Sequence, residues 1–158
     1  MAKAEYTRIM TTNNCEFPNE NNKQDEYLVD TSVWIEFLNG KPGPAVDQLK
    51  TWLTTGKVVG LTAAIYQEIL QGAASEAHFR KFQTYFSQQP FYHPLDPIAS
   101  FAEAARIYFL CRRRGLTIRS TIDCLIARIA IEHDLVLLHN DRDFESIATV
   151  IPELRLLK

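Results

Sequence analysis

The fold is decided by residues 27–38, which read YLVDTSVWIEFL. The first three residues are apolar and stand directly before a carboxylate, so they predict a short strand that ends at Asp30. Val33, Trp34 and Phe37 then recur at helical spacing, and this periodicity predicts a helix. The segment therefore predicts a strand that is followed almost at once by a helix.

The rest of the chain continues this alternation of short apolar strands and helices. Further strands are predicted at residues 57–61, 90–93, 135–139 and 154–157. Further helices are predicted at residues 44–53, 63–73, 76–87, 98–109, 120–133 and 141–148. Because short, wholly apolar strands that alternate with helices are typical of covered parallel sheets, the pattern predicts an α/β protein with helices on both faces of the sheet.

Composition is consistent with one domain. The chain has 158 residues, of which 46% are hydrophobic, and its net charge is −2. Residues 27–158 are predicted to form the domain, whereas residues 1–26 are polar and lack periodicity, which predicts a flexible extension. No apolar stretch approaches the ~20 residues of a membrane span, and the start has no signal-peptide pattern. An odd number of cysteines, without metal-ligand spacing, favours a reducing cytoplasm.

Carboxylates follow two of the predicted strands. Asp30 comes directly after the first strand, and Asp141 follows residues 135–139. Because binding sites in parallel sheets lie beyond the carboxyl ends of the strands, both side chains are expected at one rim. Glu68 and Asp123 lie beside the apolar stripes of their helices, where a carboxylate is partly desolvated. The four residues are therefore candidates for one acidic site.

Each candidate also has a purely structural interpretation. Asp30 and Asp141 precede predicted helices, where an aspartate can serve as the N-cap. Asp123 stands three residues after Ser120, which is the spacing of a capping box. Glu68 taken alone is typical of a solvated helix residue. One residue at a time, the sequence leaves the structural and the functional interpretations open.

Their chemistry as a group is more specific. Several carboxylates in one partly dry cleft raise each other's pKa, and a divalent cation removes that conflict. Oxygen ligands without a nearby histidine or cysteine favour Mg²⁺ or Mn²⁺ over zinc. Two such ions about 4 Å apart can activate water and stabilise the leaving oxygen of a phosphodiester. The pattern therefore favours a metal-dependent nuclease.

Three segments of the chain resemble PIN-domain ribonucleases, above all the VapC-type toxins of bacterial toxin–antitoxin pairs. In chain order they read YLVDTSVWIEFL, TAAIYQEILQG and STIDCLIARIAIEHDLVLLHNDRDF. The resemblance covers residues 27–158 and implies a three-layer α/β/α sandwich with a mostly parallel, five-stranded sheet. Family members usually begin near the YLVD strand, so residues 1–26 are additional.

The same resemblance implies an activity and its residues. It implies Mg²⁺- or Mn²⁺-dependent cleavage of RNA, which inhibits translation or growth until a cognate antitoxin binds, and it implies a homodimer. Thr31 or Ser32 matches the hydroxyl residue that supports the first aspartate, and Asp143 matches a further metal ligand. Four carboxylates match the catalytic, metal-binding positions of the family, and these are Asp30, Glu68, Asp123 and Asp141.

The densest basic stretch consists of Arg112, Arg113 and Arg114, with Arg119 shortly after. These arginines are predicted to contact RNA phosphates. The structural alternative for the first three is stabilisation of the negative end of a helix dipole. For Arg119 the alternative is an ion pair with the antitoxin.

Two other functions compete with the nuclease. A phosphatase that forms an aspartyl phosphate, as haloacid-dehalogenase-like enzymes do, would use Asp30 as its nucleophile. Such an enzyme needs a second aspartate at the position of Ser32. A non-catalytic PIN-like binding module would use its acidic residues only for helix caps and partner contacts.

Overall fold

The structure of the protein is a computed structural model that describes residues 25–158. The predicted flexible extension therefore lies outside the described residues, apart from Asp25 and Glu26. Cys111 and Cys124 are buried and unpaired, in agreement with their place in apolar helix patterns. None of the helices in residues 25–158 has the length and apolar character that a membrane-spanning segment needs.

Four short strands form one sheet in the order β2-β1-β3-β4. The strands are β1 (Tyr27–Val29), β2 (Val59–Gly60), β3 (Val136–Leu138) and β4 (Arg155–Leu157). All three pairs of neighbouring strands are parallel. Strand β1 therefore lies inside the sheet, and its residues Leu28 and Val29 are fully buried. The first predicted segment of the chain is thus also the centre of the fold.

The predicted fifth strand is wrong for the described residues. Residues 90–93 make a single parallel bridge, in which Phe91 pairs with Leu61 next to β2. The Leu61 amide donates to the Pro90 carbonyl at 2.9 Å, and the Tyr92 amide donates to the Leu61 carbonyl at 2.8 Å. Proline lacks an amide proton, so Pro90 and Pro94 cannot donate to a ladder and pairing does not extend further.

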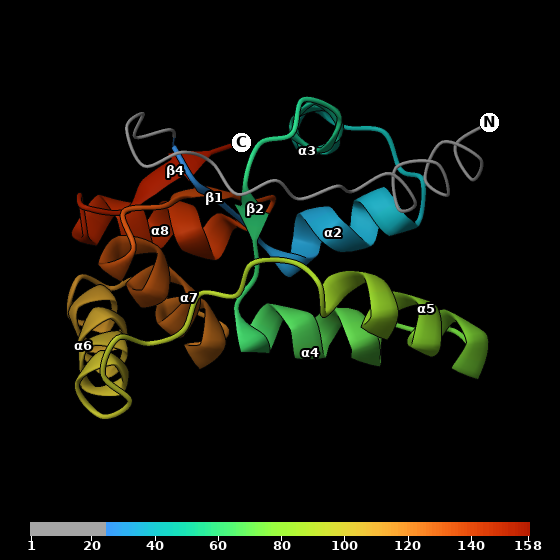
Figure 1. The fold of residues 1–158 in the computed structure, drawn as a ribbon. Helices are drawn as coiled ribbons and strands as arrows, with labels where there is room; N and C mark the ends of the chain where they lie inside the picture. Colours follow the sequence, from blue (N-terminus) through green and yellow to red (C-terminus); the bar gives the residue numbers. More distant parts are fainter. Residues whose placement is uncertain (1–24) are drawn as a thin grey trace, which may run out of the picture.

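Residues 25–158 contain seven helices, which cover the sheet (Figure 1). In the view of Figure 1, α3 lies above the strands, whereas α4, α5, α6 and α7 lie below them. The parallel sheet between helices confirms the predicted α/β class. The helices are α2 (Thr31–Leu38), α3 (Pro44–Thr54), α4 (Ala63–Gln71), α5 (Glu76–Phe86), α6 (Ala99–Arg113), α7 (Thr121–Glu132) and α8 (Arg142–Val150).

Local chemistry determines where the helices begin. Asp30 caps α2, Ser120 caps α7 and Asp141 caps α8, each through a side-chain oxygen that accepts a backbone amide proton. The Ser120 hydroxyl accepts from the amide of Ile122. Because a cap directs the chain into a helix from an extended residue, each of these turns is defined within a few residues. Two of the predicted site carboxylates are therefore also caps.

Candidate active site

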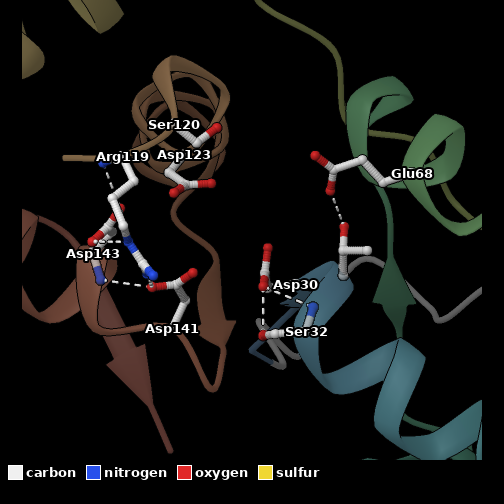
Figure 2. A pocket seen from close by; sticks show the side chains of 9 residues that line it. Asp30, Ser32, Glu68, Arg119, Ser120, Asp123, Asp141 and Asp143 are labelled. Atoms are coloured by element: carbon white, nitrogen blue, oxygen red, sulfur yellow. Dashed lines mark hydrogen bonds and ion pairs between the residues drawn. The ribbon is translucent and has the colours of Figure 1, made fainter.

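The carboxyl ends of β1 and β3 border a pocket of about 260 Å³ (Figure 2). The structure brings together all the acidic residues that the sequence singled out, although they come from four separate segments. Nine residues line this pocket, and they are Asp30, Thr31, Ser32, Glu68, Arg119, Ser120, Asp123, Asp141 and Asp143.

Asp30 lies at the end of β1 and is only 5% exposed. Its Oδ2 atom accepts from the Ser32 amide at 2.9 Å and from the Ser32 hydroxyl at 2.6 Å. Burial raises the pKa of Asp30, and the bonds from Ser32 oppose that rise. The Ser32 hydroxyl also accepts from the Asn140 amide at 3.1 Å, so it connects the turn after β1 to the turn after β3.

Glu68 approaches the pocket from the opposite wall, on α4. Its carboxylate accepts a hydrogen bond from the hydroxyl of Thr31, which follows Asp30 directly. The two hydroxyl residues after Asp30 therefore divide their tasks, since Ser32 bonds to Asp30 and Thr31 bonds to Glu68.

Asp123 lies in the first turn of α7. Burial, as the largest cause, and the neighbouring carboxylates together raise the pKa of Asp123 to about 7. Among residues 25–158, no hydrogen bond or ion pair joins the Asp123 carboxylate to another side chain. No described side chain therefore balances its charge by direct contact. The carboxylates that act on it are, in decreasing order of effect, Asp30, Asp141, Asp143 and Glu68.

Asp141 and Asp143 share one cation, the guanidinium of Arg119 (Figure 2). The Asp143 carboxylate is 7% exposed and accepts from both the backbone amide and Nε of Arg119. The terminal Nη2 of Arg119 lies 2.5 Å from Oδ1 of Asp141. Arg119 is thus the one cation among the pocket residues, which otherwise include five carboxylates.

The donor set fits a hard divalent cation, because it consists of carboxylate and hydroxyl oxygens and contains no sulfur or imidazole. Burial is the largest cause of the raised pKa of Asp123, and four neighbouring carboxylates add to it; a cation would relieve the repulsion among these charges. Within the part of the chain that the structure describes, no three acidic, histidine or cysteine side chains are already gathered at ligand positions. A cation would therefore have to draw the carboxylates together.

The other arginines lie elsewhere. Arg112, Arg113 and Arg114 are at the end of α6 and do not line the pocket. Arg113 lies over the ring of Phe109 at 5.8 Å, and Arg114 donates to the carbonyl of Thr149 at 3.1 Å. These contacts and the helix-end position account for the three arginines structurally, so a role in RNA binding stays a prediction for them.

Sequence reasoning missed the contact of His139 with the backbone of Asp141, a residue that lines the pocket. The ring is 1% exposed, and its Nδ1 lies 2.8 Å from the carbonyl oxygen of Asp141. Because a carbonyl can only accept, Nδ1 carries the proton in this bond. Burial lowers the pKa of His139 and favours the neutral ring. Its position at the end of a buried strand was the available signal.

Comparisons with known proteins agree with this geometry. The family model of the PIN domain matches residues 27–150. The VapC ribonuclease Mb1587 of Mycobacterium bovis is 33% identical over 124 residues, which is 78% of this chain and 92% of that protein.

Two solved structures have the same fold. VapBC-1 from nontypeable Haemophilus influenzae matches with a TM-score of 0.63 and 20% identity over 84% of this chain and 96% of that one. VapBC2 from Rickettsia felis, bound to a DNA fragment from their promoter, matches with a TM-score of 0.62 and 19% identity over 83% and 96%.

Proposed function

The chain belongs to the VapC-type ribonucleases of the PIN-domain family, and we propose that its acidic pocket is the active site of a metal-dependent endoribonuclease. One observation carries this assignment to the pocket. Carboxylates from the end of β1, α4, α7 and the turn before α8 converge there, and burial together with the neighbouring carboxylates raises the pKa of Asp123 to about 7. A purely structural cluster would provide each carboxylate with its own donors.

Four carboxylates would hold Mg²⁺ or Mn²⁺, and they are Asp30, Glu68, Asp123 and Asp141. A bound cation of this kind would activate water and would stabilise the negative charge that develops on a phosphodiester. Asp143 is a further metal ligand only as a prediction, because both of its oxygens accept hydrogen bonds from Arg119. Ser32 and Thr31 orient Asp30 and Glu68 by the hydrogen bonds described above.

Helix geometry at the pocket favours an anionic substrate. Helices α2, α7 and α8 all begin beside it, since Asp30, Ser120 and Asp141 are their N-caps and also line it. The amino-terminal end of a helix carries a partial positive charge, which stabilises a phosphate or a carboxylate nearby. In the proposed nuclease domain, residues 27–158, the N-termini of these three helices can therefore stabilise both the carboxylates of the pocket and a phosphate of RNA.

An antitoxin completes the proposal. Structural neighbours of the chain are VapBC complexes, which supports a cognate antitoxin that binds this protein and blocks its activity. We also propose a homodimer in the cytoplasm, as the family resemblance implies. Co-expression with the protein of a neighbouring short reading frame, followed by co-purification and light scattering, measures both associations.

Asp30→Asn tests the active site. Asparagine is as good an N-cap as aspartate, so α2 is expected to keep its start and the fold to persist. Loss of the charge is expected to abolish the cleavage of RNA, measured by mapping cleaved ends after a pulse of expression in cells.

Asp47→Asn is the matched control, because Asp47 is an exposed acid on α3 that does not line the pocket. It is expected to cleave like the unaltered protein. Full activity of Asp30→Asn, or equal loss in both variants, would refute the assignment.

The family assignment does not support the aspartyl-phosphate phosphatase. A non-catalytic PIN-like module predicts that neither variant differs from the unaltered chain in RNA cleavage, because none of the three would cleave. The same experiment therefore separates the enzyme from the binding module.

A further inference from the structure

Arg119 contacts the pocket in two unequal ways. Its Nε lies 3.2 and 3.3 Å from the two oxygens of Asp143, and its backbone amide donates to the same carboxylate at 2.7 Å. Its Nη2 bonds to Asp141 alone. One end of the side chain is therefore held by several bonds to one residue, and the other end by a single ion pair.

Exposure differs in the same direction. The Asp143 side chain is 7% exposed, whereas Asp141 is 31% exposed and Arg119 is 68% exposed. Ion pairs that water can reach are weak, and buried charge-assisted bonds are stronger. Arg119 therefore stays attached to Asp143 through its backbone amide and Nε when the bond from Nη2 to Asp141 is broken.

A divalent cation at Asp141 would meet this guanidinium. Both are positive and both need the same carboxylate, whose Oδ1 atom already accepts from Arg119 and from the Asp143 amide. Two positive groups on one carboxylate repel each other. The divalent ion is attracted more strongly by the surrounding carboxylates, because it carries two charges and the guanidinium carries one.

We propose that Arg119 has two roles, and this inference rests on the function proposed above. In the metal-free site its guanidinium is the counter-ion of Asp141, and in the metal-bound site it binds a phosphate of the substrate. Arg119 neutralises Asp141 in the metal-free protein. When a divalent cation takes Asp141, the guanidinium leaves that carboxylate, stays anchored on Asp143 and becomes available to a phosphate of RNA. Arg119 then competes with the metal for Asp141 and, once displaced, is a contact for the substrate.

Direct metal binding tests the first half. Mn²⁺ is titrated into the full chain, and free Mn²⁺ is measured by electron paramagnetic resonance. Arg119→Gln is expected to bind Mn²⁺ about three- to tenfold more tightly than the unaltered protein, because a competing charge is gone. Arg119→Lys keeps the charge but not the fork of donors, so a smaller gain is expected.

Arg142→Gln is the control for a general change of charge. Arg142 directly follows Asp141, is exposed and does not line the pocket. It is expected to change Mn²⁺ affinity less than twofold. Equal affinity of the Arg119→Gln and Arg142→Gln variants, or weaker Mn²⁺ binding by Arg119→Gln, overturns the inference.

The second half has its own measurements. In ¹⁵N spectra of the arginine Nε groups, saturation with Mg²⁺ is expected to leave the Nε of Arg119 slow in hydrogen exchange while its Nη groups exchange faster. The Michaelis constant for the RNA identified by cleavage mapping is expected to rise about tenfold in Arg119→Gln at saturating Mn²⁺. Unchanged exchange of the Nη groups, or an unchanged Michaelis constant, would contradict the proposal that Arg119 binds a phosphate in the metal-bound site.

Failure of this inference differs from failure of the proposed function. If Arg119→Gln changes nothing while Mn²⁺ binding still depends on Asp30, only the inference fails. If the unaltered chain does not bind Mn²⁺ at all, both fail.

Discussion

Two acidic residues at opposite ends of α7 have contrasting surroundings. Asp123, in the first turn, makes no hydrogen bond to another described side chain and faces four other carboxylates. Glu132, in the last turn, has a side chain that is 4% exposed. Three groups donate to it, namely the Ser100 hydroxyl at 2.7 Å, Nε of Arg128 at 2.8 Å and the Leu95 amide at 3.1 Å.

The two pKa values move in opposite directions. Desolvation acts to raise the pKa of Glu132, but its three hydrogen-bond donors and the charge of Arg128 outweigh it, and the pKa falls. Desolvation raises the pKa of Asp123 as well, and there the neighbouring charges add to it. The comparison teaches that Glu132 is satisfied by donors of the protein, whereas Asp123 has no such donor among the described side chains and, under the proposed function, would be satisfied by a divalent cation.

Asp123→Asn is expected to have the largest effect. It removes a charge that a cation would need, so RNA cleavage is expected to fall about 10³-fold, equivalent to about 4 kcal/mol of activation free energy. The melting temperature in EDTA is expected to stay equal or to rise, since a repelled charge has gone. A variant that melts much lower but still cleaves RNA would make Asp123 a structural residue like Glu132.

Glu132→Ala is expected to show the reverse behaviour. The free energy of unfolding is expected to fall by about 2–4 kcal/mol, because buried donors lose their acceptor. Urea unfolding measures this loss, and Mn²⁺ affinity of the folded variant is expected to stay unchanged. Glu132→Gln keeps one acceptor oxygen and is the milder control. A stable Glu132→Ala variant would remove the distinction between the two ends of α7.

The dependence on pH sharpens the comparison. A cation needs Asp123 unprotonated, so with a pKa of about 7 the Mg²⁺ affinity is expected to rise about fivefold from pH 6 to 7 and about twofold from pH 7 to 8. Calorimetric titration of Mg²⁺ at the three pH values measures this rise. Asp123→Asn is expected to weaken binding and to flatten the profile, and an equally steep profile in that variant would assign the proton elsewhere.

In EDTA, the two residues are expected to change the free energy of unfolding in opposite directions as pH rises. An acid whose pKa is raised by folding makes the metal-free protein less stable as pH rises from about 4 to 7, as expected for Asp123. The lowered pKa of Glu132 stabilises the folded protein at pH values above the ordinary pKa of a glutamate, and this contribution is lost as pH falls through the lowered pKa.

Arg128→Ala is expected to have the smallest effect. The Arg128 side chain is 30% exposed and provides one of the three donors to Glu132. Its removal is expected to cost about 1 kcal/mol of unfolding free energy, since Ser100 and the Leu95 amide remain. Thermal unfolding measures the change. A loss as large as that of Glu132→Ala would show that the ion pair, rather than the whole set of donors, stabilises this end of α7.

Most of the fold was predictable because local rules agree along the chain. Asp30 ends an apolar strand and caps the next helix, so one residue marks both boundaries. Thr62 is likewise the N-cap of α4, and its hydroxyl accepts from the Ile65 amide at 3.2 Å. Such signals depend on neighbours within four residues, which the sequence displays directly.

Predictions were weaker where distant contacts decide. The predicted fifth strand is only a single bridge at Phe91, because prolines flank it. Large aromatic side chains are usually buried, but Phe79 is 37% exposed and Phe82 is half-buried. Other aromatic residues are buried, and these include Trp34, Phe37, Trp52, Tyr85 and Phe86.

The sequence by itself determined the order of strands and helices, their caps, and which acidic residues follow strands or flank apolar stripes, because these properties depend on short-range periodicity and hydrogen bonding. Only the tertiary structure decided which charges meet. Arg119 pairs with Asp141 and Asp143 across 22 and 24 residues of chain, whereas Asp123 has no donor among the side chains of residues 25–158. Such pairings follow from how the helices pack on the sheet, since electrostatic interactions depend on distance in space and not along the chain.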